Sequence, residues 1–267
     1  THQDLVNKWA INTADNNNNG ADDDGNGYVD DWRGWDAADN DNDPSVPASA
    51  TATIWSHGNH VAGISAGETN NSLGIASIGF NCKLIPVKIG QSSTGWLTGA
   101  YQGVDYAIAA GADVINMSWG GSSWSATGKA IFDLAYSKGI LCVAAAGNNN
   151  DSAKMYPASF DHVISVAATG AAGSTTSDAR AWFSSYGSLV DVSAPGVDIT
   201  SALHTGTSNY GLMNGTSMAS PLVAGLVGLM KSYNPAPIDT IEACLKRTCD
   251  NINSVNSAYI GKLGAGR

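Results

Sequence analysis

Two short polar segments, each placed directly before an apolar helix, contain the residue types needed for nucleophilic catalysis. One is SHGNHVAG at 56–63, with His57 and His60, and the other is NGTSMASP at 214–221, with Ser217. A serine hydroxyl becomes a nucleophile when a neighbouring base, most often a histidine, removes its proton. The free N–H groups and the positive end of the dipole at a helix start stabilise the negative charge that then develops. The pattern predicts Ser217 as a nucleophile.

The order of these residues excludes one large class of serine hydrolases. An α/β-hydrolase needs Gly-x-Ser-x-Gly, but Ala219 stands at the last position of that pattern. In those enzymes the histidine also follows the serine, whereas His57 precedes Ser217 here. On position alone Ser217 is an ordinary helix cap and Asn148 an ordinary turn residue. The catalytic interpretation therefore depends on the joint pattern.

From residue 57 onward, apolar β-branched runs alternate with Ala-rich helical stretches. Strands are predicted at 83–89, 112–119, 140–146, 162–169 and 189–194, and helices at 97–110, 125–138, 217–233 and 238–247. Strands that are buried on both faces and joined by helices predict an α/β fold in three layers, a mostly parallel β-sheet flanked by helices. In such folds, ligands bind at the C-terminal ends of the strands. Three Gly-rich, polar stretches lie at those positions: 118–121, 145–150 and 214–217.

Four segments together resemble the signature segments of the subtilisin-like serine proteases, or subtilases. They are SHGNHVAG, GADVINMSWGG, VAAAGN and NGTSMASP, in the order that is typical of the family. The resemblance extends over residues 1–267 and implies a single subtilisin-like peptidase domain. It implies that His57 is the general base, Ser217 the nucleophile and Asn148 the side-chain donor of the oxyanion hole.

The resemblance also implies a substrate-binding cleft with two walls. Ser118, Trp119 and Gly120 match the segment that lines the cleft and pairs with an extended peptide. The opposite wall of the primary specificity pocket matches a second segment: Ala145, Ala146 and Gly147. Binding through the peptide main chain implies broad specificity.

The orienting aspartate of the family's catalytic triad has no match in the sequence. In the family it lies a few residues before a His-x-Asp-Leu pattern, which His2 and Asp4 match, and GKLGAGR at 261–267 resembles a segment that runs on into a final helix. We therefore expect a truncated copy of an active protease that lacks the catalytic Asp and the C-terminal end. Such a chain should have very weak activity or none. No spacing argument makes Asp4 or Asp43 a substitute.

An acidic stretch predicts a calcium site. DDDGNGYVDDWR at 22–33 has the spacing of an EF-hand loop, with Gly27 at the turn position. The predicted ligands are Asp22, Asp24, Asn26, Tyr28 through its carbonyl, and Asp30. Arg33 stands where a bidentate Glu belongs, so a further ligand must come from Asp31 or from 36–43. The alternative is a solvated acidic loop, but ten Asp with one Arg between 15 and 43 repel one another unless a cation neutralises them.

Composition excludes several function classes. That same stretch accounts for −9 of the net charge of −10, and no basic patch supports nucleic-acid binding. No apolar run is long enough to span a membrane, and no Cys/His cluster has zinc-ligand spacing. The favoured hypothesis is a secreted, extracellular, calcium-stabilised serine endopeptidase that acts on polypeptides through an acyl-enzyme and is made with a propeptide. The alternatives are a catalytically impaired pseudoprotease of the same fold and a calcium-dependent binding module.

Overall fold

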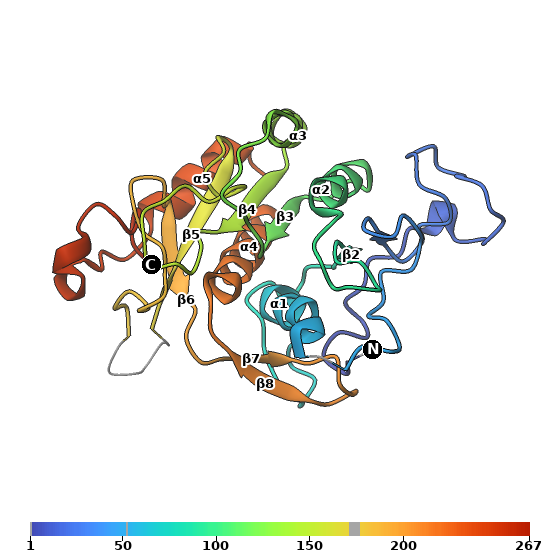
Figure 1. The fold of residues 1–267 in the computed structure, drawn as a ribbon, viewed down its shortest axis with the longest axis horizontal. Coiled ribbons are helices and arrows are strands. Elements are labelled where there is room, and N and C mark those ends of the chain that lie inside the picture. Colours follow the sequence, from blue (N-terminus) through green and yellow to red (C-terminus); the bar gives the residue numbers. More distant parts are fainter. Residues whose placement is uncertain (1, 52, 171–176) are drawn as a thin grey trace.

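A four-stranded parallel sheet forms the centre of the molecule. The computed structural model describes residues 2–51, 53–170 and 177–267 (Figure 1). The strands are β3 (Val114–Met117), β4 (Leu141–Ala145), β5 (Val163–Thr169) and β6 (Val192–Pro195), in the order β3-β4-β5-β6. Cys142 pairs with Ile115 on one side and with Val163 on the other. Both central strands are buried throughout, as the continuous apolar runs predict.

Helices cover both faces of this sheet. On one face, α4 (Thr216–Tyr233) and α5 (Ile238–Arg247) pack against Val143, Ile164 and Val192. On the other face, α2 (Ala100–Ala109) and α3 (Ala126–Ser137) pack against a second apolar cluster, which includes Met117 and Cys142. The predicted fold class, a three-layer α/β arrangement with a mostly parallel sheet, is confirmed.

The helix that carries the predicted base packs directly against the helix that carries the predicted nucleophile. α1 (Ser56–Ala66) contacts α4 over much of its length. The two approach closely because Gly225 has no side chain, and a β-carbon there would collide with the carbonyl oxygen of Ser65. α1 also lies beside an antiparallel hairpin of β7 (Ile199–Ala202) and β8 (Tyr210–Met213), which leads into α4 (Figure 1).

One predicted strand is much shorter than expected, and one observed hairpin has no predicted counterpart. The expected strand at 83–89 is reduced to β2 (Val87–Lys88), which pairs in parallel with β1 (Trp35–Asp36). Pro86 has no N–H to donate, which limits regular pairing in the middle of that run. The hairpin of β7 and β8 was not predicted, because each strand has only four residues and its apolar alternation is weak.

The remaining regular elements are single turns of 3-10 helix. They are η1 (Thr13–Asp15), η2 (Thr53–Trp55), η3 (Asn253–Val255) and η4 (Ser257–Tyr259). Within the described ranges, no helix has the length and apolar character required to cross a bilayer.

Candidate active site

Ser217 is the second residue of α4. The N-terminal end of this helix lies at the C-terminal edge of the sheet. Its hydroxyl donates to the carbonyl oxygen of Ser118, just beyond β3, at 3.2 Å. In return, the Ser118 hydroxyl donates to the Ser217 carbonyl at 2.8 Å and lies 3.0 Å from Ser220 Oγ. These bonds fix the first turn of α4 against the end of β3.

Asn148, in the loop after β4, is held by Thr216. Its Oδ1 accepts the Thr216 backbone N–H and the Thr216 hydroxyl, each at 2.9 Å. A backbone N–H can only donate, so the amide oxygen must face Thr216 and Nδ2 must point the other way. In the described part of the chain nothing accepts a hydrogen bond from Nδ2. Asn148 therefore presents a fixed and available donor.

Asn148 Nδ2 and the Ser217 backbone nitrogen both lie beside Gly215. A β-carbon on Gly215 would lie 3.5 Å from Ser217 N and 3.6 Å from Asn148 Nδ2. Gly215 has no β-carbon, so the space between the two donors stays open. Two fixed donors that converge beside a serine hydroxyl are the arrangement that stabilises the oxyanion of a tetrahedral intermediate. Ser217 and Asn148 therefore lie close to each other, and their catalytic roles stay predictions.

His57 is the second residue of α1 and is partly exposed. Burial, with a smaller contribution from the neighbouring His60, holds the pKa of His57 below its usual value of 6.5. The imidazole is therefore neutral, and able to accept a proton, over a wider pH range than a free histidine. No hydrogen bond joins His57 to Ser217 in the ranges described, and such bonds often tighten only when substrate binds.

The start of α1 is tied to the hairpin by two further histidines. Ser56 Oγ lies 2.6 Å from His204 Nδ1 and accepts the His204 backbone N–H at 3.3 Å. His60, one turn after His57, is fully buried and donates from Nε2 to the Gly211 carbonyl at 3.0 Å. His60 is therefore a core residue, and its bond to Gly211 fixes the position of the helix that carries His57.

No carboxylate in the described residues lies within 4.0 Å of a His57 nitrogen. The Asp4 side chain accepts from Asn71 Nδ2, Ile75 N–H and the Tyr210 hydroxyl, at 2.8, 3.0 and 2.7 Å. Asp43 instead forms an ion pair with Arg33 at 3.3 Å. Neither carboxylate contacts His57.

The predicted cleft wall has backbone groups available for a peptide. After Ser118, neither Trp119 nor Gly120 forms a backbone hydrogen bond with another described residue, whereas Gly121 is paired with Tyr156 through two bonds of 2.8 Å. The Trp119 ring packs edge-on against Tyr101, with centroids 5.8 Å apart. A short unpaired edge of this kind is where an extended peptide adds as an extra strand.

The opposite wall continues β4. Ala145 ends the strand, and Ala146 donates its N–H to the Val166 carbonyl at 3.0 Å. The Gly147 N–H donates to Thr216 Oγ1 at 3.2 Å, and its backbone has a φ of +111°, which glycine adopts readily. This wall is therefore joined to Thr216, the residue that also holds Asn148.

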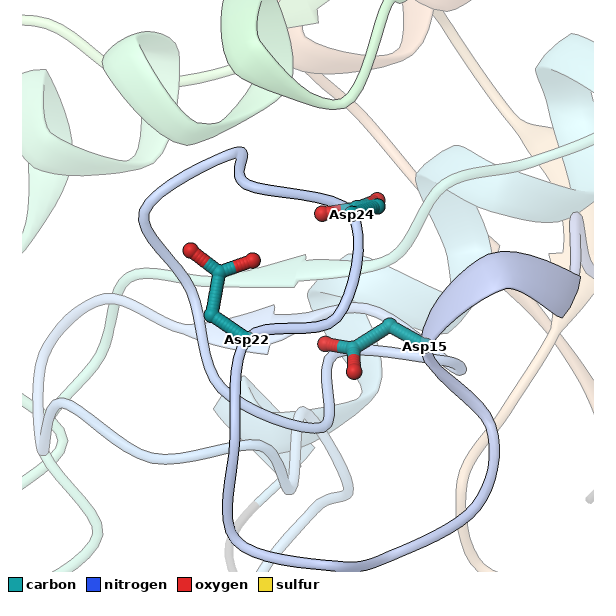
Figure 2. A group of neighbouring side chains, drawn as sticks. All are labelled: Asp15, Asp22 and Asp24. Carbon is teal, nitrogen blue, oxygen red and sulfur yellow. The ribbon is translucent and has the colours of Figure 1, made fainter.

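The acidic loop brings two of the predicted metal ligands together with a third aspartate. Figure 2 shows the side chains of Asp15, Asp22 and Asp24, each of which offers one carboxylate oxygen within 4.8 Å of the other two. Hydrogen bonds from backbone N–H groups, first that of Gly27, hold the pKa of Asp22 below its usual value. Oxygen donors with this charge suit a hard cation such as Ca²⁺.

The side chains of the other predicted ligands have hydrogen-bond partners of their own. Asn26 Nδ2 donates to Asp24 at 3.2 Å and to Asp31 at 3.1 Å. The Asp30 carboxylate accepts the N–H groups of Asn19 and Gly20, at 3.0 and 2.8 Å. The Tyr28 hydroxyl lies 3.5 Å from Asp105.

The sequence patterns alone do not identify two residues of these sites. Thr216 is fully buried, and its hydroxyl joins Asn148, the predicted oxyanion donor, to Gly147 in the predicted pocket wall. Its position directly before Ser217 was the only sign of this role in the sequence. Asp15 is also fully buried. It lies seven residues before Asp22, the first residue of the EF-hand-like stretch, so the EF-hand spacing did not include it.

Comparison with known proteins agrees with this geometry. The profile of the subtilase family matches residues 7–261. The chain is 40% identical over 228 residues to the thermophilic serine proteinase of Bacillus sp. (strain AK1), covering 85% of this chain and 53% of that protein. It is 39% identical over 227 residues to thermitase of Thermoactinomyces vulgaris, covering 85% and 76%.

Among solved structures, a protease of Pseudoalteromonas arctica PAMC 21717 superposes with a TM-score of 0.70 at 34% identity, covering 82% of this chain and 77% of that one. The chain spans about half the length of several curated relatives, including subtilisin E of Bacillus subtilis, of which it covers 53%. The family match extends from near the first residue to near the last. On this evidence and on the arrangement around Ser217, the chain belongs to the subtilase family.

Proposed function

We propose that this chain is the peptidase domain of a serine endopeptidase that works through an acyl-enzyme. The observation that carries the proposal is that the Ser217 backbone nitrogen and Asn148 Nδ2 lie together beside Gly215, while Thr216 holds the Asn148 amide oxygen. A serine that only capped a helix would need no second donor held in place by its neighbour.

In the proposed reaction, substrate binding turns the Ser217 hydroxyl from the Ser118 carbonyl toward His57. His57 takes the proton as Oγ attacks the scissile carbonyl carbon. The oxygen of that carbonyl becomes negatively charged and accepts from Ser217 N–H and Asn148 Nδ2. His57 then returns the proton to the leaving amine, and water hydrolyses the acyl-enzyme by the same steps.

The substrate is a polypeptide in extended conformation. The free backbone groups of Trp119 and Gly120 support binding through the peptide main chain, which carries little sequence information and gives broad specificity. Secretion and a propeptide in the precursor belong to the same proposal, because the named relatives include subtilisins and thermitase.

Turnover by the 267 residues alone should be low. An aspartate normally holds the imidazole in the productive tautomer and stabilises the imidazolium, and no described carboxylate contacts His57. In subtilisin itself, loss of that aspartate alone lowers kcat by roughly 3 × 10⁴. We therefore expect slow acylation at Ser217 rather than efficient peptide cleavage.

Labelling with a fluorophosphonate tests the proposal. The chain should gain one phosphonyl group by intact mass, at Ser217 by peptide mapping, and the Ser217→Ala variant should gain none. His57→Ala should slow the labelling, because the general base is lost. A chain that is folded by circular dichroism but is not labelled would contradict the endopeptidase and favour the pseudoprotease.

We also propose that Asp15, Asp22 and Asp24 hold a Ca²⁺ ion that stabilises the acidic loop. Three carboxylates meet there, and Arg33, the one cation of that stretch, is paired with Asp43 instead. Calcium would supply the missing positive charge and draw oxygens of the loop together. A calcium-dependent binding module would share this site but would not need the arrangement at Ser217.

Calcium should therefore raise the unfolding temperature. At 100 times its Kd, a ligand that binds only the folded state adds about 2.7 kcal/mol to the free energy of unfolding. We expect this gain to disappear with EDTA and to be lost in the Asp22→Asn/Asp24→Asn double variant. Asp161→Asn, on an exposed carboxylate elsewhere, serves as the matched control. Equal unfolding temperatures in calcium and in EDTA would contradict the site.

A further inference from the structure

One side chain lies between the two walls of the substrate cleft. A β-carbon on Gly120, in the first wall, would lie 2.9 Å from Met155 Cγ and 3.1 Å from its Sδ. A β-carbon on Gly147, in the opposite wall, would lie 3.1 Å from Met155 Cε. The Met155 side chain therefore extends from one wall to the other and fills the space between them.

The backbone on both sides of Met155 is fixed. Its N–H donates to Ser159 Oγ at 3.2 Å, and its carbonyl accepts the Ser159 N–H at 2.8 Å. The next residue, Tyr156, forms two backbone hydrogen bonds with Gly121, directly after the first wall. These bonds fix the backbone of Met155 and therefore the direction of its Cα–Cβ bond.

Met155 differs from the methionines of the hydrophobic core. Met117 and Met218 are each 1% exposed, whereas Met155 remains partly exposed and lies outside the three buried core clusters. Its neighbours Gly120 and Gly147 have no side chains, so its thioether occupies volume that a substrate side chain would otherwise enter. A partly exposed apolar side chain between two binding walls suits a role in selecting ligands more than a role in the core.

We propose that Met155 closes the floor of the primary specificity pocket and limits the substrate residue on the acyl side of the scissile bond to a small side chain, such as Gly, Ala or Ser. The inference rests on the proposed peptidase function and narrows its broad specificity at one position. Large side chains such as Phe are disfavoured because the thioether must leave its contacts to admit them.

Peptidyl diphenyl phosphonates test the inference, because each carries one chosen side chain next to the phosphorus that Ser217 attacks. Labelling rates would be measured for the Ala and Phe reagents on the unmodified chain, on Met155→Ala and on Met230→Ala. Met230, on α4 and packed against the core, is the matched methionine outside the cleft. The unmodified chain should favour Ala. Met155→Ala should raise the Phe-to-Ala ratio by on the order of 100-fold, and Met230→Ala should leave it unchanged.

A second measurement separates this inference from the proposed function. In the Ser217→Ala background, calorimetry would compare the binding of product-type peptides that end in Ala or in Phe, which needs no catalysis. A chain that no phosphonate labels, but whose preference for Ala depends on Met155, would contradict the peptidase and support the role of Met155. Equal preference for Ala and Phe, or a preference that Met155→Ala leaves unchanged, would overturn the role of Met155 even if a fluorophosphonate labels Ser217.

Discussion

Replacement of Asn148 by Asp is expected to slow phosphonylation of Ser217 by roughly 10²–10³-fold, the range found for the corresponding donor in subtilisin. The substitution keeps an oxygen where Oδ1 accepts from Thr216, so the loop should stay in place. It replaces Nδ2, the donor that faces Gly215, by a second oxygen that repels the developing oxyanion. The loss should therefore fall on the transition state and leave the fold intact.

The second-order labelling rate measures this effect. Asn149→Asp provides the control, because that neighbouring side chain is also exposed and the substitution adds the same charge. We expect Asn149→Asp to label within a few-fold of the unmodified chain and both variants to unfold at the same denaturant concentration. If Asn148→Asp labels as fast as Asn149→Asp, Asn148 is not a donor to the oxyanion.

Replacement of Lys88 by Met is expected to lower the free energy of unfolding by about 3–5 kcal/mol. Lys88 Nζ forms ion pairs with Asp36 and, at 3.0 Å, with Asp39, and the Lys88 and Asp36 side chains are only 7% and 2% exposed. Burial alone would lower the pKa of Lys88, but hydrogen bonds to the two aspartates outweigh it and raise that pKa. Methionine would leave the buried Asp36 carboxylate without its cation.

Denaturant unfolding, in a Ser217→Ala background that prevents self-digestion, measures this loss. Lys129→Met is the matched control, because the Lys129–Asp133 pair has side chains that are 42% and 45% exposed and should contribute less than about 1 kcal/mol. Asp36→Asn combined with Lys88→Met should recover part of the loss, since the amide carries no charge. Equal losses in Lys88→Met and Lys129→Met would show that burial does not strengthen the Lys88 pairs.

The layered fold could be predicted because its signals are local. β4 and β5 are buried at every position and are apolar except for Ser165 and Thr169, and the predicted helix at 238–247 coincides with α5. The pairing of strands depends on more than the local sequence pattern. The hairpin of β7 and β8 forms because α1 provides a surface on which its short strands pack, and nothing within residues 199–213 specifies that contact.

The candidate site also combines residues with local sequence signals and residues whose contacts form only in the folded chain. Ser217, His57 and Asn148 were predicted from short segments with characteristic composition, and their roles remain proposals. Thr216 and Met155 act through neighbours that are distant in sequence: Thr216 holds a side chain 68 residues away, and Met155 touches Gly120 from a separate loop. Such contacts depend on tertiary packing, which a single sequence pattern does not specify.

Bonds between residues 2–4 and the hairpin join parts of the chain that lie far apart in sequence. His2 bonds to the Asn209 carbonyl and Gln3 to the Tyr210 hydroxyl, each across 207 residues, and Asp4 accepts from Tyr210 across 206. Contacts between such distant residues close a large loop, so they form late and slow folding. During synthesis the ribosome must release most of the chain before Ser217 can meet His57. Under the proposed function, a nascent chain therefore has no assembled nucleophile with which to attack its own unfolded segments.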